Sequence, residues 1–202
     1  MTATDVFGLL GCALMCLAAI ATALRLDRFP ARVRHAVAVI AIVALFVPAG
    51  GLPLVAHVRG ATGDLSVPTL ALAASACASR ILGRSGFAPR EWNALLGAVA
   101  VAGLFLYPLA LGLTPFDPYA LGYGSAGLVT ALLIATMAAW RAGLNLPVLV
   151  VVVAIAALLA GAYESRNLWD TLVDPLAVLV ALGRWAAIAL RGMGNAFTRG
   201  KS

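Results

Sequence analysis

The chain has 202 residues, of which 63% are hydrophobic and 11% are charged. Ordinary globular domains carry roughly 25% charged residues, so this sequence lacks the polar residues that a water-soluble surface needs. The formal net charge is +6, but the basic residues are almost all arginines placed at the ends of apolar runs, without a basic stripe or interleaved aromatics. The composition therefore excludes a soluble protein and argues against a nucleic-acid partner.

Seven apolar runs follow one another along the chain, and about 20 helical residues are needed to cross a 30 Å hydrocarbon core. The runs are Val6–Leu24, Ala36–Ala56, Ser66–Leu82, Asn93–Leu113, Leu121–Trp140, Leu144–Tyr163 and Pro175–Leu190. The third and seventh are short and contain Arg80 and Arg184, so each is a tilted span, a re-entrant segment or an interfacial helix. We expect an all-α, polytopic transmembrane helix bundle of about seven segments, with six spans plus an interfacial helix as the alternative.

The N-terminal residues Met1 to Asp5 lack the positive region of a signal peptide, so we interpret the first run as a retained helix. We therefore expect residues 1–202 to form a single transmembrane domain. Prolines and glycines separate most of the runs. Pro48 and Pro108 are exceptions because they fall inside the second and fourth runs, where they are expected to kink the helices.

The arginines predict the orientation, because basic residues in short loops remain on the cytoplasmic side. They occur after the first, third and fifth runs and in a short basic tail over residues 192–202, which we expect to be cytoplasmic. Six of the eight acidic residues fall on the opposite side, and Asp27 and Glu91 are the exceptions. This distribution predicts that the N-terminus lies outside and the C-terminus inside. Abundant Ala, Val, Leu, Gly and Arg suggest a bacterial inner membrane.

Three predicted external loops carry most of the remaining polar residues, and they define a candidate external polar site. Its members are Arg59, Asp64, Asp117, Tyr119, Glu164, Asn167, Trp169 and Asp170. In one interpretation the aromatic residues form a belt at the membrane interface, and the acidic side chains keep the loops hydrated and cap helices. In the other, these residues bind a lipid headgroup, a cation or a partner protein. The second interpretation requires the loops around residues 114–124 and 163–174 to lie close together. We expect this proximity, because both loops lie at the outer ends of helices that are near neighbours in the sequence.

One further candidate is Arg184, because an arginine near the middle of a bilayer needs a polar partner and is often functional. If the seventh run is interfacial instead, Arg184 is an ordinary snorkelling residue. The sequence holds no nucleotide-binding loop, serine-hydrolase elbow or zinc-protease motif, and its three cysteines lie in apolar runs without metal-ligand spacing. We therefore expect no catalytic residue, no metal and no cofactor.

These features favour a non-enzymatic accessory or scaffold subunit of a larger membrane or cell-envelope assembly. Membrane lipids and another membrane or periplasmic protein are the expected partners. Two alternatives remain open. The predicted kinks and Arg184 are compatible with a small transporter or channel, and Asp117, Glu164 or Asp170 could serve an enzyme that modifies lipids in the outer leaflet.

Overall fold

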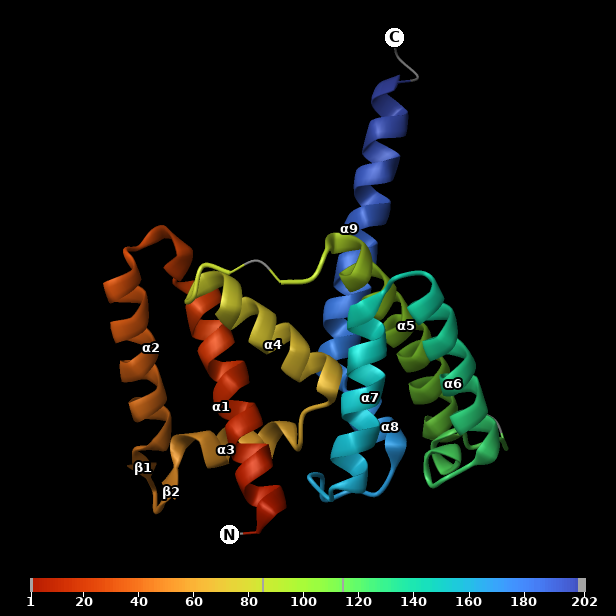
Figure 1. Cartoon of the computed structure of the whole chain (residues 1–202), viewed down its shortest axis with the longest axis horizontal. Helices are drawn as coiled ribbons and strands as arrows, with labels where there is room; N and C mark the ends of the chain where they lie inside the picture. The colour runs from red at the N-terminus through yellow and green to blue at the C-terminus, as the bar shows by residue number, and fades with distance from the viewer. Residues whose placement is uncertain (1, 85, 114, 200–202) are drawn as a thin grey trace.

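The computed structural model describes residues 2–84, 86–113 and 115–199. The chain forms a bundle in which α1 to α4 make one group of helices and α5 to α9 the other (Figure 1). In the described residues the α-helices are α1 (Ala3–Ala23), α2 (Ala31–Phe46), α3 (Leu54–Thr62), α4 (Val67–Arg80), α5 (Pro89–Pro108), α6 (Ala126–Arg141), α7 (Asn145–Leu159), α8 (Leu168–Leu172) and α9 (Pro175–Arg199). Shorter elements are η1 (Leu26–Arg28), η2 (Leu109–Leu113), η3 (Tyr119–Gly122) and the strands β1 (Pro48–Ala49) and β2 (Leu52–Pro53).

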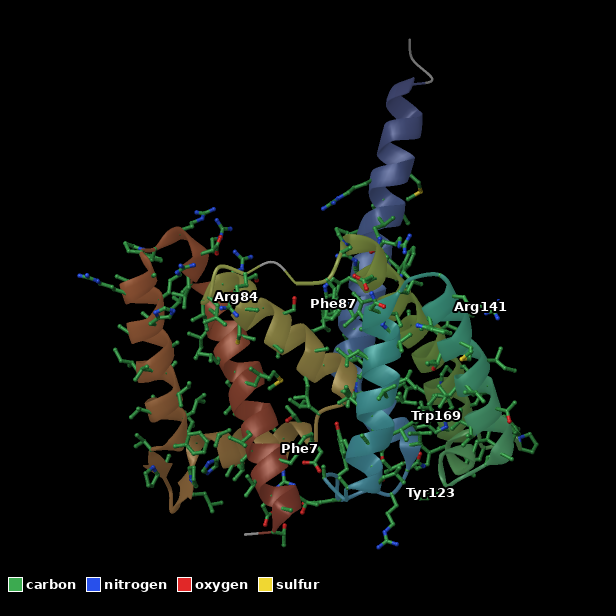
Figure 2. The ribbon with its side chains drawn as sticks, viewed as in Figure 1. Phe7, Arg84, Phe87, Tyr123, Arg141 and Trp169 are labelled. Atoms are coloured by element: carbon green, nitrogen blue, oxygen red, sulfur yellow. The ribbon has the colours of Figure 1, made fainter. Side chains whose placement is uncertain are left out.

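The long helices run between two ends of the bundle that differ in charge. The acid end comprises the start of α1, helix α3 and the loops 115–125 and 160–174 (Figure 1). The arginine end comprises the turns 24–30 and 142–144 and the segment 81–88. Figure 2 shows Phe7 and Tyr123 toward the acid end, with Arg84 and Arg141 toward the other. Helix α9 begins at the acid end, and its last turns extend past the other helices (Figure 1).

Three helices of the described residues are long and apolar enough to cross a membrane, namely Ala3–Ala23, Pro89–Gly112 and Pro175–Met193. Helices α6 and α7 are apolar but shorter, with 16 and 15 residues. The prediction of an all-α fold is confirmed, and the three long apolar helices indicate a membrane protein.

The predicted second span, Ala36–Ala56, is wrong in extent because α2 ends at Phe46. Pro48 ends the helix instead of kinking it, since proline has no N–H to continue the helical hydrogen bonds. The chain then turns through Gly50 and Gly51, both with positive φ, and Pro48 pairs with Pro53 in a short antiparallel ladder. Helix α3 follows and lies across the acid end of the bundle (Figure 1).

The other helix boundaries differ less from the predicted ones. At Pro108 the α-helical hydrogen bonds of α5 give way to the π-helical turn η2, in which Gly112 has a φ of 83°. Helix α6 begins at Ala126 rather than Leu121, because residues 119–122 form the separate turn η3. Helix α9 continues to Arg199, so it includes much of the segment 192–202 that the sequence predicts to be a tail.

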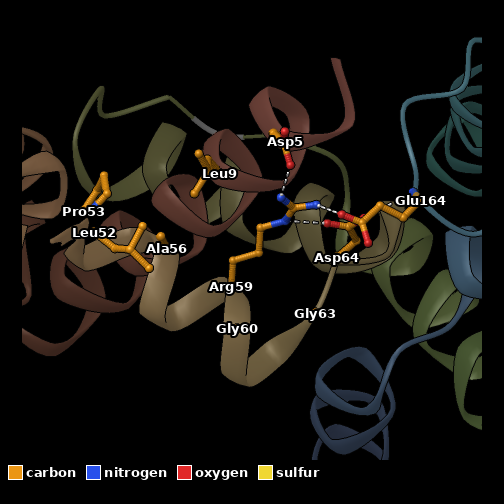
Figure 3. Close-up of a pocket in the computed structure, with 10 residues that line it drawn as sticks. All are labelled: Asp5, Leu9, Leu52, Pro53, Ala56, Arg59, Gly60, Gly63, Asp64 and Glu164. Carbon is orange, nitrogen blue, oxygen red and sulfur yellow. Dashed lines mark hydrogen bonds and ion pairs between the residues drawn. The ribbon is translucent and has the colours of Figure 1, made fainter. Parts of the chain in front are cut away.

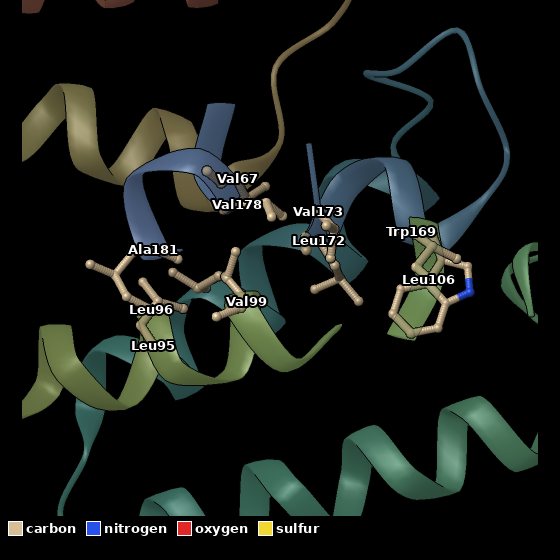
Figure 4. Close-up of a cluster of buried hydrophobic side chains, with 14 of the residues drawn as sticks. Val67, Leu95, Leu96, Val99, Leu106, Trp169, Leu172, Val173, Val178 and Ala181 are labelled. Atoms are coloured by element: carbon tan, nitrogen blue, oxygen red, sulfur yellow. The ribbon is translucent and has the colours of Figure 1, made fainter. Parts of the chain in front are cut away.

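The largest cluster of buried apolar side chains joins α5, α7, α8 and α9 to the first turn of α4. Leu95, Val99 and Val178 belong to it, and Figure 4 shows Trp169 at one edge of the cluster. Helices α5 and α9 pack closely because Gly103 has no side chain. A Cβ atom at Gly103 would lie 2.4 Å from a methyl carbon of Val178. This cluster holds the loops of the acid end in place.

Candidate functional site

Arg59, on α3, lies at the centre of an ion-pair cluster at the acid end (Figure 3). Its Nε donates to Asp64 Oδ1 over 2.9 Å, and its two terminal nitrogens donate to Asp5 Oδ1 over 3.1 Å and to Glu164 Oε1 over 2.7 Å. The three carboxylates come from α1, from the loop before α4 and from the loop after α7. One guanidinium therefore joins three separate segments of the chain.

The cluster forms one wall of a cavity of about 540 Å³. Leu9, Leu52, Pro53 and Ala56 supply the apolar part of the lining. Gly8 makes the cluster possible from the α1 side, since a Cβ atom there would lie 2.2 Å from Arg59 Nε. The small face that Gly8 and Cys12 present on α1 therefore accommodates a guanidinium as well as neighbouring apolar side chains.

The charges of the cluster do not balance, because three carboxylates surround one guanidinium. The hydrogen bond with Asp64 raises the pKa of Arg59, and its bond with Asp5 acts in the same direction. The side chains of Arg59 and Asp64 are 15% and 14% exposed, whereas Glu164 is 66% exposed. The excess negative charge is therefore on the rim that faces solvent.

A second group of candidate residues joins the loop 115–125 to the segment 163–174. The Tyr119 hydroxyl donates to Asp170 Oδ2 over 2.9 Å, and the Asn167 amide donates to the carbonyl of Tyr119 over 3.0 Å. The indole N–H of Trp169 donates to the carbonyl of Pro118 over 2.9 Å. The predicted proximity of these two loops is therefore confirmed.

Close packing fixes this second group. The side-chain oxygen of Asn167 accepts from Trp169 N over 2.9 Å and lies where a Cβ atom of residue 122 would be. Only a glycine at position 122 leaves space for Asn167, since the two atoms would be 1.7 Å apart. Burial raises the pKa of Tyr119, and its hydrogen bond to Asp170 raises it further.

The eight predicted site residues thus form two groups. Arg59, Asp64 and Glu164 line the cavity at α3, together with Asp5, which the prediction did not include. The remaining residues, Asp117, Tyr119, Asn167, Trp169 and Asp170, form the second group. Asp117 has a local role in it, because it accepts from Tyr119 N over 2.9 Å.

Asp174 is a buried acid that is not among the eight predicted site residues. Its carboxylate accepts from Ser66 N over 2.7 Å, from the Thr69 hydroxyl over 2.8 Å and from Ala177 N over 2.6 Å. It therefore holds the first turns of α4 and α9 together at 8% exposure. The acid directly before Pro175 was a signal for a helix cap, but its bonds to α4 could not be read from the sequence.

Arg184 has a polar partner that is not a carboxylate. Its Nε donates to Asn93 Oδ1 on α5 over 2.8 Å, at an exposed position. Trp185, the next residue, packs against Gly97 of α5. The pair joins α5 and α9 toward the arginine end.

The chemistry that these groups can perform is limited by their internal bonds. Cys12 lies beneath the Arg59 cluster, with its sulfur 3.8 Å from the Thr62 hydroxyl, and His57 bonds to the carbonyl of Pro53. Within the described part of the chain, no group of three or more His, Cys, Asp or Glu residues is arranged to hold a metal ion. Both groups at the acid end are therefore suited to holding segments of the chain together and to exposing negative charge at the surface.

Comparisons with protein-family models, with curated proteins and with solved structures found no match to this chain.

Proposed function

We propose that this chain is an inner-membrane protein with seven crossing helices and the acid end outside the cytoplasm, and that it serves as an accessory or scaffold subunit of a larger membrane or envelope assembly. The seven helices are α1, α2, α4, α5, α6, α7 and α9. They alternate in direction between the two ends of the bundle (Figure 1), which supports this topology. The arginine-rich turns meet at one end, as the positive-inside rule requires of a cytoplasmic surface.

Helix α4 is the shortest of these seven, with 14 residues that cover about 21 Å. It packs against α1, α7, α8 and α9, and its first three residues are buried. A central helix can therefore be shorter than the hydrocarbon core.

Cysteine labelling in intact cells tests the topology. In a background without the native cysteines, Ala61→Cys on α3 should react with a membrane-impermeant maleimide. Ala142→Cys, in the turn after α6, should react only after permeabilisation. Both positions are exposed, so the reverse pattern would overturn the orientation.

One observation carries the accessory role: most of the polar groups described at the acid end hold this chain's own segments together. Arg59 binds three carboxylates, and Asp170 and Asp174 accept bonds from Tyr119 and Thr69. A catalytic site would instead direct such groups toward a substrate. Helix α2 adds support, since Val39, Ile40 and Val43 on it are exposed and only Ala38 and Leu45 are buried.

Photo-cross-linking in native membranes tests this role. A photoreactive residue at Ile40, which is 67% exposed, should give an adduct with a second protein, whereas one at the buried Leu146 should not. Purification in mild detergent should recover the same protein. Recovery of a lone monomer from native membranes, without an Ile40 adduct, would contradict the proposal.

The two alternative functions receive less support. The cavities between α4 and α7 and between α5 and α6 are lined mainly by apolar side chains, which does not favour the passage of polar solutes. For a lipid-modifying enzyme, alanine variants of Asp117, Glu164 and Asp170 decide the question. Loss of cell function in one variant that still folds would favour the enzyme over the accessory subunit.

A further inference from the structure

Helices α6 and α7 form a hairpin whose two helices leave an apolar groove at the acid end. The residues 142–144 join the helices at the arginine end. The groove has a volume of about 570 Å³, within the range of small-molecule sites. Its lining comes from the halves of α6 and α7 that are distant from the turn, and Leu128, Leu132, Ile155 and Leu158 are among its residues.

The open end of the groove is polar. Tyr123 and Arg166 line it there, and both are exposed. Figure 2 shows Tyr123 at the acid end and Arg141 at the opposite end of α6. Arg166 pairs with no carboxylate among the described residues, in contrast to Arg59, which pairs with three. It is therefore a cation without an ion-pair partner among the described residues, at the mouth of an apolar groove.

We propose that this groove binds an anionic phospholipid, with one acyl chain between α6 and α7 and the phosphate at Arg166. The apolar walls match a hydrocarbon chain, and the guanidinium can donate charge-assisted hydrogen bonds to phosphate oxygens. Tyr123 is suited to the boundary between the two, because tyrosine concentrates at membrane interfaces. The site is independent of the accessory role and of the Arg59 cluster.

The shape of the groove favours a lipid over a helix of a partner protein. The α6 side of the groove runs from Leu128 to Thr136, which is about 12 Å of helix. Helix partners in membranes pack along longer faces of small residues, whereas this lining consists largely of Leu, Val and Ile. A single flexible chain can fill such a groove.

Native mass spectrometry of the full-length protein tests the proposal. The protein is incubated in detergent with equimolar phosphatidylglycerol and phosphatidylcholine. The number of molecules of each lipid that remain bound to one protein molecule is then counted. We expect the wild type to prefer phosphatidylglycerol. Arg166→Gln should lower that preference about fivefold, the ratio that corresponds to about 1 kcal/mol for one basic residue beside anionic lipid.

Two matched controls separate the groove from general surface charge. Arg141→Gln removes an exposed arginine from the other end of α6, so it should leave the preference unchanged. Ile155→Trp fills the groove and should reduce the retention of both lipids, whereas Ile40→Trp on the exposed face of α2 should not. Equal retention of the two lipids by the wild type, or an equal effect of Arg166→Gln and Arg141→Gln, would overturn the proposal.

Discussion

Two buried carboxylates, Asp174 and Glu91, hold helices together at opposite ends of the bundle. Their exposures are 8% and 9%, and each accepts hydrogen bonds from the starts of two helices. Glu91 accepts from Ala88 N over 2.9 Å at the start of α5 and from Asn145 N over 2.9 Å at the start of α7. Asp174 does the same for α9 and α4.

The two carboxylates differ in which helices they connect and in how well water can replace their hydrogen bonds. Asp174 joins the α1–α4 group to the α5–α9 group, and its three bonds are buried. Glu91 joins two helices of one group. Its bonds to Ala88 N and Asn145 N are partly buried, and its longer bond to Leu146 N, over 3.2 Å, is buried. The comparison indicates that the acid end determines how the two groups of helices dock, whereas the arginine end fastens neighbours within one group.

The largest expected effect is that of Asp174→Ala. It leaves two amides and the Thr69 hydroxyl without an acceptor in a buried place, so the free energy of unfolding should fall by about 3 kcal/mol. Asp174→Asn should fall between this variant and the wild type, because its amide keeps one acceptor oxygen. Denaturant unfolding in detergent, followed by circular dichroism, measures both. A point variant ordinarily loses about 1 kcal/mol of unfolding free energy. A loss below that value would show that Asp174 does not hold the two groups of helices together.

Gly122→Ala should lower the free energy of unfolding by about 2 kcal/mol, because the new methyl group displaces Asn167 from tightly packed surroundings. The matched control is Gly183→Ala on α9, where a Cβ atom meets no other atom within 4 Å. That variant should be as stable as the wild type or slightly more stable, since alanine favours helix. Equal stability of the two variants would show that the contact between the acid-end loops is looser than the structure indicates.

Glu91→Ala should lower the melting temperature less than Asp174→Ala does. The reason is that water at the arginine end can take over two of its three bonds, those to Ala88 N and Asn145 N, whereas all three bonds of Asp174 are buried. Parallel thermal scans of both variants in one detergent give the ranking. An equal or larger shift for Glu91→Ala would invert the comparison between the two ends.

The smallest effect is expected for Asp27→Asn, which removes the exposed ion pair with Arg80 at the arginine end. The hydrogen bond from Arg80 lowers the pKa of Asp27, so the folded state favours the charged carboxylate. The stabilisation is therefore present above the ordinary aspartate pKa of about 4 and is lost as the pH falls through the lowered pKa. Melting curves of the two proteins should differ slightly at pH 7 and converge in strong acid.

Hydropathy predicted the helices well where no proline or glycine turn interrupted an apolar run. The first and sixth runs became α1 and α7 with small shifts at their ends. The second run was wrong in extent because its hydropathy continues past Pro48, which was expected to kink the helix but ends it, and past Gly50 and Gly51, which form a turn. The expected chemistry of the candidate site is still a proposal, but the loops that carry it meet as expected at Tyr119 and Asp170.

By itself, the sequence determined that the protein is helical and apolar, and which apolar runs contain the long helices. These properties depend on residues within a few turns of one another. Only the tertiary structure decided which charges meet. Arg59 reaches Glu164 across 105 residues of chain, as Thr69 reaches Asp174. The physical reason is that such pairs depend on how helices pack, and Gly8, Gly103 and Gly122 allow that packing only through contacts with residues distant in the sequence.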